Sequence, residues 1–248
     1  MAKDNLEVIR FESRKLMGEA AAKAVSEKIN ELLNFKPVVN MIFAAAPSQN
    51  EFLEALVTKK VDWKRINAFH MDEYLELDAE APQGFGNFLR ERLFNKIAFK
   101  SVNYLDGNAE NAELECKRYS DLLEMNPTDI VCMGIGENTH LAFNDPHVAD
   151  FNDSKLVKVV DLDEECRVQQ VNDGCFETVS DVPTHALTLT IPTLFKSTYA
   201  YCMVPGPKKA QAVYHTLNEP ISEKFPSTIL RQHPNAILFI DDKSSVLV

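Results

Sequence analysis

Several absences narrow what this chain can be. No stretch approaches the roughly 18 consecutive apolar residues of a membrane-spanning helix. The N-terminal sequence MAKDNLEVIRF has no apolar signal core. The 5 cysteines are scattered and include no C-x-x-C pair, the spacing typical of zinc and redox motifs. We therefore expect a cytoplasmic protein with reduced thiols and no structural zinc.

Basic residues are also scarce relative to acidic ones. The chain has 26 Lys and Arg against 37 Asp and Glu, a formal net charge of −11. An acidic surface of this kind disfavours nucleic acid and anionic membrane as partners. A few local Lys or Arg residues can still hold a small anionic molecule, so a small-molecule substrate is the expected partner. The sequence leaves open whether the chain forms a homo-oligomer.

What the chain does contain is an alternation of strand and helix patterns. No repeat, low-complexity tract or linker interrupts it, and 248 residues suit one domain covering 1–248. Apolar, β-branched runs predict strands at 38–46, 65–71, 129–136, 155–162, 186–191, 199–206 and 235–242. Amphipathic segments predict helices at 13–33, 48–56, 88–97, 111–123 and 208–217. The alternation predicts an α/β fold: a doubly wound, mostly parallel sheet flanked by helices, as in a Rossmann-like three-layer sandwich.

Polar segments follow several of the predicted strands. In sheets of this type, ligands bind beyond the carboxyl ends of the strands. Four segments satisfy that rule, and each carries polar groups: 45–49, 70–74, 134–145 and 205–209. These segments are therefore the places where the sequence predicts a site.

The stretch GIGENTHLAFNDP (134–146) is the richest of them. Its glycines allow the backbone to turn sharply and to approach a ligand closely. The dinucleotide-binding pattern G-x-G-x-x-G fails, because its third position is Thr139 and Pro146 interrupts a following helix. His140, with Asp145 five residues later, favours a pair that moves protons near neutral pH. The alternative is a hydrogen-bonded structural histidine.

The stretch HMDEY (70–74) carries adjacent acids at a predicted strand end. On an extended chain Asp72 and Glu73 point opposite ways, so one can face a site while the other faces solvent or a salt bridge. A carboxylate there can act as a general base. The alternative is a turn with two solvated acids.

Anion-binding groups are predicted at three places. In AAAPSQNEF (44–52), Ser48 is an N-cap candidate with Glu51 three residues later, the capping-box pattern. A helix N-terminus there suits a phosphate, although without glycine the segment is not a P-loop. Arg167 and Lys209 can each hold a phosphate as well. The alternatives are an ordinary helix cap and two surface charges.

Five segments together resemble the glucosamine-6-phosphate deaminase (isomerase) family, which is related to the 6-phosphogluconolactonases. They are FHMDEY, GIGENTHLAFNDP, DVPTHALTLTIPTL, VPGPKKAQAV and PSTILRQHPNAILFID, in this order, and they span nearly the whole chain. The resemblance implies an enzyme of amino sugar catabolism, part of carbohydrate metabolism. It would open the ring of an amino sugar 6-phosphate, isomerise the aldose to a ketose and release ammonia, giving fructose 6-phosphate. The family uses no metal and no organic cofactor.

The resemblance also implies catalytic roles for individual residues. His140 matches the family histidine that acts as acid and base in ring opening, and Asp145 matches the acid that orients and charges it. Asp72 matches the base that takes the C2 proton and returns one to C1. Asn138 matches a position that is Asp or Asn among relatives.

Substrate-binding roles follow from the same resemblance. Gly134 matches a loop glycine whose backbone lies against the sugar. Arg167 and Lys209 match the family's phosphate cations. Ser48 matches the hydroxyl of the phosphate loop, and Ala46 lies in that loop.

Three departures from the family pattern concern the substrate more than the fold. Asp145 stands where the family usually has Glu, so its carboxylate reaches about 1.5 Å less. The loop 44–49 has side chains where bare backbone would approach a phosphate. Thr139 replaces the glycine before the histidine. The configuration of the amino sugar, gluco or galacto, therefore stays open.

Two other functions stay open as well. A 6-phosphogluconolactonase-type hydrolase shares the architecture and a G-x-G-x-x-x-H stretch, but its pattern after the histidine runs toward S-L-F-P. This chain has LAFNDP, which favours the deaminase. A non-catalytic sugar-phosphate sensor is the third possibility, motivated by the altered loop 44–49.

Overall fold

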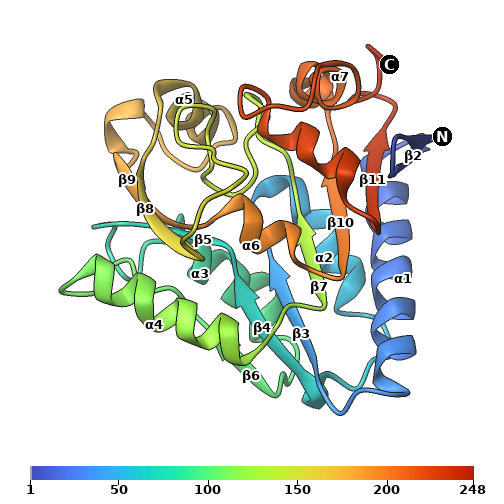
Figure 1. Cartoon of the computed structure of the whole chain (residues 1–248), viewed down its shortest axis with the longest axis horizontal. Helices are drawn as coiled ribbons and strands as arrows, with labels where there is room; N and C mark the ends of the chain where they lie inside the picture. Colours follow the sequence, from blue (N-terminus) through green and yellow to red (C-terminus); the bar gives the residue numbers. More distant parts are fainter. Residues whose placement is uncertain (1) are drawn as a thin grey trace.

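The structure, a computed structural model, describes residues 2–248 and is built around one large sheet (Figure 1). Its strands lie in the order β1-β2-β11-β10-β7-β3-β4-β6. Their bounds are Ala2–Lys3 (β1), Leu6–Phe11 (β2), Val39–Phe43 (β3), Ile66–His70 (β4), Ser101–Asn103 (β6), Ile130–Met133 (β7), Tyr199–Val204 (β10) and Ala236–Asp241 (β11). All neighbouring strands are parallel except β1 and β2. The predicted α/β fold with a mostly parallel sheet is confirmed.

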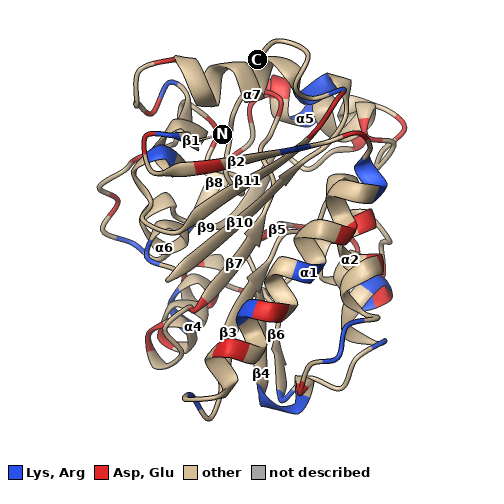
Figure 2. Cartoon of the chain, turned by 90° about the vertical axis from the view of Figure 1, so that its right-hand side faces the viewer, with Lys and Arg blue, Asp and Glu red and all other residues tan. Residues whose placement is uncertain are grey.

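Helices cover both faces of this sheet (Figure 2). They are α1 (Arg14–Leu33), α2 (Asn50–Leu56), α3 (Phe85–Leu89), α4 (Ala112–Met125), α5 (Glu164–Asn172), α6 (Ile191–Phe195) and α7 (Ala210–Asn218). Side chains of β3 alternate between the faces: Met41 and Phe43 pack in one core cluster with α1 and α2, and Ile42 packs in the other with α4 and α7. Because both faces are buried, the strand reads as a nearly continuous apolar run.

A second, smaller sheet stands apart from the first. Its antiparallel strands are β5 (Asp72–Tyr74), β9 (His185–Leu189) and β8 (Val157–Asp161), in that order. The strands predicted at 155–162 and 186–191 therefore exist, but they do not extend the parallel sheet. Since β5 begins just after β4 ends, the small sheet continues the chain from the carboxyl edge of the large one.

Some local predictions were wrong. Ser48 does not cap α2: Pro47–Gln49 forms a 3₁₀ turn, and the helix begins at Asn50 without a side-chain cap. Glu51 instead accepts hydrogen bonds from Arg14 on α1. The helix predicted at 88–97 is α3 followed by a π-helical turn, Arg90–Phe94.

The N-terminal part of the chain also differs from expectation. Strand β2, which pairs with β11, was not predicted. Helix α1 was predicted correctly, and Ser13 caps it by accepting a hydrogen bond from the amide of Leu16. Met17, Ile29 and Leu32 are buried on its inner face, whereas Leu16 is 46% exposed. Within residues 2–248, no helix has the length and apolar character needed to cross a membrane.

Candidate active site

A cleft lies at the carboxyl ends of β3, β4, β7 and β10. All of the strand-end segments singled out in the sequence contribute to its lining: part of 44–49, then Met71 and Asp72, part of 134–143, and Lys209. They meet because parallel strands end at the same edge of a sheet. The cleft therefore brings together Ala46, Ser48, Asp72, Gly134, His140 and Lys209.

The loop after β7 presents His140 through a tight turn. The Gly136 amide donates to the carbonyl of His140, and the Thr139 amide donates to the carbonyl of Gly136. A Cβ added at Gly136 would lie 2.2 Å from Cε1 of the His140 ring, so only glycine fits there. Thr139 adopts φ 73°, in the left-handed region that a β-branched residue disfavours. This backbone conformation suits glycine, the residue that the family pattern implies at that position.

His140 and Asp145 are in direct contact. Nδ1 of His140 lies 2.9 Å from Oδ1 of Asp145 and 2.8 Å from Oδ1 of Asn138. Asn138 in turn donates from Nδ2 to the same Asp145 oxygen at 3.0 Å. Because both neighbours of Nδ1 are acceptors, this nitrogen carries the proton and Nε2 is left for a ligand. The shorter carboxylate therefore reaches the ring without any loop shift.

The charge on Asp145 is stabilised by these partners. Burial alone raises the pKa of this fully enclosed carboxyl, but the hydrogen bonds and charge of His140, with the hydrogen bond from Asn138, outweigh burial. The result is a pKa below the usual aspartate range. Asp145 is therefore ionised at neutral pH and can stabilise a charged imidazole.

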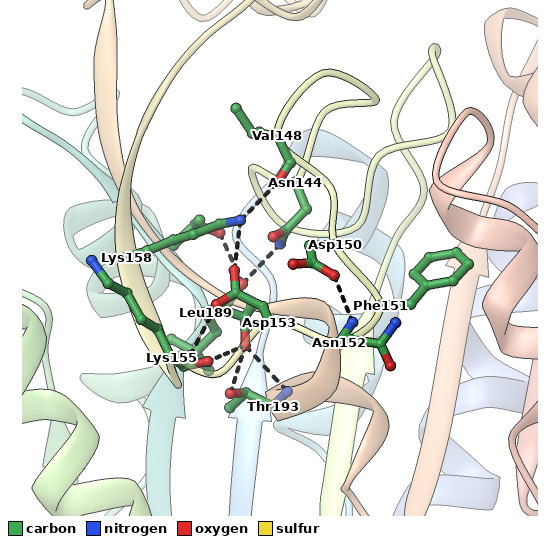
Figure 3. Close-up of polar contacts among 12 residues, drawn as sticks. Asn144, Val148, Asp150, Phe151, Asn152, Asp153, Lys155, Lys158, Leu189 and Thr193 are labelled. Atoms are coloured by element: carbon green, nitrogen blue, oxygen red, sulfur yellow. Dashed lines mark hydrogen bonds and ion pairs between the residues drawn. The ribbon is translucent and has the colours of Figure 1, made fainter.

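The segment that follows Asp145 is fastened to the small sheet (Figure 3). Lys158 of β8 extends to Asp153, with Nζ 2.9 Å from Oδ2, and donates to the carbonyl of Val148 at 2.7 Å. Asn144, directly before Asp145, donates from Nδ2 to the carbonyl of Leu189 at 2.8 Å. These contacts come from strands outside the loop, so they hold Asp145 in place relative to the cleft.

Asp72 lies in a different environment, at the start of β5. It lines the cleft beside Met71 and is 7% exposed. Burial raises its pKa well above the usual range, and the charge of Glu73 raises it further. A carboxylate with a raised pKa can accept a proton near neutral pH, which is what a general base needs.

Glu73 points the other way, as expected for neighbours on a strand. Its Oε1 accepts from the amides of Tyr74 and Phe85, and its Oε2 accepts from the amide of Gly86 at 2.7 Å. The side chain therefore satisfies the first backbone donors of α3 rather than facing solvent or a cation. This contact ties the strand that carries Asp72 to a helix.

His70 is a further member of the site that the sequence reasoning missed. Its Nε2 accepts from the amide of Leu105 at 2.9 Å, so Nδ1 carries the hydrogen and donates to the carbonyl of Asp72 at 3.0 Å. Burial lowers its pKa to about 4. His70 is thus a neutral positioning residue for Asp72. The only available signal was its place in FHMDEY.

The cleft is also lined by Lys209. Its pKa is lowered by burial, against the opposing charges of Asp173 and Glu137. Its neighbour Lys208 is exposed and donates to the carbonyl of Asn172 instead. Of the two lysines, only Lys209 lines the cleft, as the family pattern implied.

The phosphate-loop match lies beside Lys209. Gln49 donates from Nε2 to Oγ of Ser48 at 3.1 Å and to the carbonyl of Met203 at 3.3 Å. A Cβ added at Gly134 would lie 3.0 Å from Nε2 of Gln49 and 3.3 Å from Oγ of Ser48, so this glycine lets the two loops approach closely. Ala46 contributes to the same wall. Gln49 was not singled out from the sequence.

Arg167 is not brought to the cleft. Its guanidinium donates to the carbonyls of Val179 at 2.6 Å and Val182 at 3.0 Å, downstream of α5. Helix α5 contributes Gln169 and Gln170 to the lining, and Asp173 follows from the end of the helix. In this arrangement Arg167 holds the segment after α5, and its role toward phosphate stays a prediction.

Comparison with known proteins places this cleft in context. The family model for glucosamine-6-phosphate isomerases and 6-phosphogluconolactonases matches residues 12–239. Glucosamine-6-phosphate deaminase of Bacillus cereus (strain B4264) is 34% identical over 226 residues, which is 91% of this chain and 84% of that protein. The deaminase of Bacillus cytotoxicus is 32% identical over 240 residues, covering 96% of this chain and 88% of that protein.

Solved structures agree with the sequence matches. A monomeric glucosamine-6-phosphate deaminase has a TM-score of 0.88 at 29% identity and covers 98% of this chain and 100% of its own. The 6-phosphogluconolactonase of Thermotoga maritima has a TM-score of 0.78 at 20% identity, covering 96% of this chain and 100% of its own, which is a likeness of fold. The chain therefore belongs to the glucosamine-6-phosphate isomerase/6-phosphogluconolactonase family.

Proposed function

We propose that this protein is a glucosamine-6-phosphate deaminase that converts its substrate to fructose 6-phosphate and ammonia. One observation carries the proposal: a proton-accepting carboxylate, Asp72, a carboxylate-paired imidazole, His140, and a buried cation, Lys209, line one cleft. Every one of these groups comes from a single chain, so the scheme requires no second copy. Deaminases of the two Bacillus species share about a third of the sequence along nearly the whole chain.

Ring opening is assigned to His140. Its Nε2 can take the proton of the anomeric hydroxyl and deliver one to the ring oxygen, while Nδ1 stays bonded to Asp145. The permanent charge of Asp145 stabilises the imidazolium formed between the two transfers. Asn138 fixes the geometry by bridging both partners.

Isomerisation is assigned to Asp72. A base that takes the C2 proton must hold it and then return it to C1, so both the charged and the neutral carboxyl must be accessible. The raised pKa of Asp72 provides for this. Return of the proton to C1 leaves an imine at C2; water adds to this imine and ammonia departs, which gives the ketose. No step in the scheme calls for a metal or an organic cofactor.

Phosphate binding is assigned to Lys209 and to the loop that carries Ala46 and Ser48. The ammonium of Lys209 makes no hydrogen bond or ion pair with the described residues, and its position in the cleft leaves it available for an anion. Ser48 adds a hydroxyl to the same cleft. Arg167 joins this group only if substrate draws α5 over the cleft.

The deciding experiment is an ammonia-release assay with the pure protein. Glucosamine 6-phosphate should release ammonia and form fructose 6-phosphate, and the Asp72→Asn variant serves as the matched inactive control. Galactosamine 6-phosphate in parallel decides the configuration of the sugar. Hydrolysis of 6-phosphogluconolactone without ammonia release would replace the proposal by a lactonase. Tight binding of glucosamine 6-phosphate without turnover would replace it by a sensor.

A further inference from the structure

A third reactive side chain lies beside the His140–Asp145 pair. The thiol of Cys166, in the first turn of α5, is buried next to it, and a ring nitrogen of His140, a carboxylate oxygen of Asp145 and Sγ of Cys166 all lie within 4.8 Å of one another. Oδ2 of Asp145 is buried and makes no hydrogen bond of good geometry among the described residues, although the Cys166 thiol and the Asp163 backbone are hydrogen-bonding neighbours of this carboxylate. An unpartnered buried oxygen is costly, so this group has unused capacity for a ligand.

The spacing of these atoms suits a tetrahedral metal ion. Ligands bound to zinc through nitrogen and oxygen at about 2.0–2.2 Å lie about 3.3 Å apart. Nδ1 of His140 and Oδ1 of Asp145 are 2.9 Å apart, so an ion could enter between them after a displacement of a few tenths of an ångström. Oδ1 of Asn138, 2.8 Å from the same nitrogen, can provide a fourth oxygen ligand, or water can occupy that position.

The chemistry of the donors indicates which ion. One thiolate, one imidazole and one carboxylate select zinc over magnesium or calcium, which prefer sets made only of oxygen. We propose that His140, Asp145 and Cys166 form a Zn²⁺ site, and that the bound ion inhibits the enzyme. Inhibition follows because the proton of Nδ1 moves to Nε2 when the metal takes the lone pair of Nδ1, which removes both the His140–Asp145 hydrogen bond and the free acceptor at Nε2. The inhibitory consequence rests on the proposed function, whereas the metal site does not.

In the metal-free protein the thiol is neutral. Burial raises the pKa of Cys166 well above the usual range, and the charges of Asp145 and Asp163 raise it further. Zinc binding therefore releases the thiol proton to solvent, while the ring proton of His140 shifts from Nδ1 to Nε2.

A neighbouring group of possible ligands is an alternative metal site. Asp145, His147 and Asp163 also offer one ligand atom each within 4.8 Å of one another. This set has no sulfur, and Nε2 of His147 is already 2.9 Å from Asp161. The group with Cys166 is better matched to zinc because all three of its side chains are buried and one is a thiolate ligand.

Cobalt(II) is a direct probe, because it occupies zinc-type sites and a cobalt–thiolate bond gives a charge-transfer absorption in the near ultraviolet. Chelator-treated protein should bind one cobalt ion with this absorption, and Zn²⁺ should displace it. Cys166→Ser should abolish the band and weaken Zn²⁺ binding by about ten-fold or more. Cys175→Ser, a thiol after the same helix, and His147→Ala should leave both unchanged. Loss of binding in His147→Ala, or an unchanged band in Cys166→Ser, would overturn the proposed ligand set.

Inhibition by zinc is tested separately, by measuring ammonia release. Saturating Zn²⁺ should stop ammonia release by the wild type, and Cys166→Ser should require about ten-fold more Zn²⁺ or higher. Full turnover with the cobalt site shown to be filled would overturn inhibition. If neither metal-free nor metal-loaded protein releases ammonia while the cobalt band is present, the proposed function fails and the metal site stands.

Discussion

Asp72 and Asp145 are two buried aspartates of one site, yet their environments shift their pKa values in opposite directions. Asp72 lies at a strand end and meets mainly apolar surroundings and the charge of Glu73, so its pKa is raised. Asp145 is as deeply buried, but His140 and Asn138 donate to it, so its pKa is lowered. Both carboxyl groups are therefore buried, and the hydrogen-bond donors decide whether the pKa is lowered or raised.

The difference assigns the two roles. A carboxyl that can hold a proton near neutral pH suits a base that must take and return one. A carboxylate that stays charged suits the orientation and stabilisation of an imidazolium. In active sites, two acids whose environments separate their pKa values commonly divide the roles of acid and base between them.

The largest effect is expected when Asp72 is neutralised. Asp72→Asn should slow ammonia release by about 10²–10⁴-fold, the usual scale for a general base. The free energy of unfolding at pH 7 should rise, because the substitution removes a buried charge that folding disfavours. Turnover assays and urea denaturation check the two parts. Activity within a few-fold of wild type would reduce Asp72 to a structural residue.

His70, which donates a hydrogen bond to the carbonyl of Asp72, should make the free energy of unfolding depend on pH. His70 has a folded pKa of about 4 against an unfolded value near 6.5, so the unfolded chain takes up a proton first as the pH falls. Stability from neutral His70 is complete above about pH 6.5 and is lost toward pH 4, by about 3 kcal/mol.

His70→Gln removes the titrating group and should flatten this part of the profile. Urea denaturation of both proteins between pH 7 and 4 is the measurement. Parallel stability curves for wild type and variant would show that His70 does not remain neutral on folding.

The positive charge of Lys209 should affect substrate binding rather than proton transfer. Lys209→Ala should weaken substrate binding by about 1.5–3 kcal/mol, as for loss of a charge-assisted hydrogen bond. Lys208→Ala is the matched control, because Lys208 bonds to the carbonyl of Asn172 outside the cleft. KM values for the two variants decide which of the two lysines binds the phosphate. Equal losses would mean that neither lysine alone binds phosphate.

The same Asp→Asn change at Asp145 should have the opposite effect on stability. A carboxyl with a lowered pKa stabilises the fold above its unfolded pKa, and this contribution is lost as pH falls through the folded value. Asp145→Asn should therefore lower the unfolding free energy at pH 7 by about 1.5–3 kcal/mol. Turnover should fall by about 10–10²-fold, less than at Asp72, since His140 remains. Increased stability in this variant would contradict the contrast between the two acids.

The smallest effect concerns the turn that presents His140. Thr139 has φ 73°, which costs an L residue about 1–2 kcal/mol and glycine almost nothing. Glycine adds about 0.4–1 kcal/mol of unfolded-state entropy, so Thr139→Gly should stabilise the protein by up to about 1 kcal/mol. Thermal denaturation checks the sign, and a lower melting temperature would show that the threonine makes compensating contacts.

The sequence predicted the site best where strand topology dictates position. Apolar runs located the central strands, and parallel strands must end at one edge, so the meeting of the segments that carry Asp72, His140 and Lys209 followed from pattern. The choice of these three residues within the segments came from the family resemblance. The alternation along β5 also placed Asp72 and Glu73 on opposite sides.

Features that depend on tertiary packing could not be predicted from the sequence. The direction of Arg167 is set by two carbonyls after α5, and no spacing in the sequence encodes that contact. Ser48 fits a capping pattern, but Pro47 starts a 3₁₀ turn first. The role of His70 depends on Leu105, which is distant in sequence.

The most direct test of the contrast is to titrate the two carboxyl groups themselves. Carbon-13 NMR of aspartate-labelled, chelator-treated protein, with Asp72→Asn and Asp145→Asn to assign the signals, gives both pKa values. The pKa of Asp72 should lie well above, and that of Asp145 below, the usual aspartate value of about 3.9. Equal values, or the reverse order, would contradict the division of acid–base roles between the two aspartates.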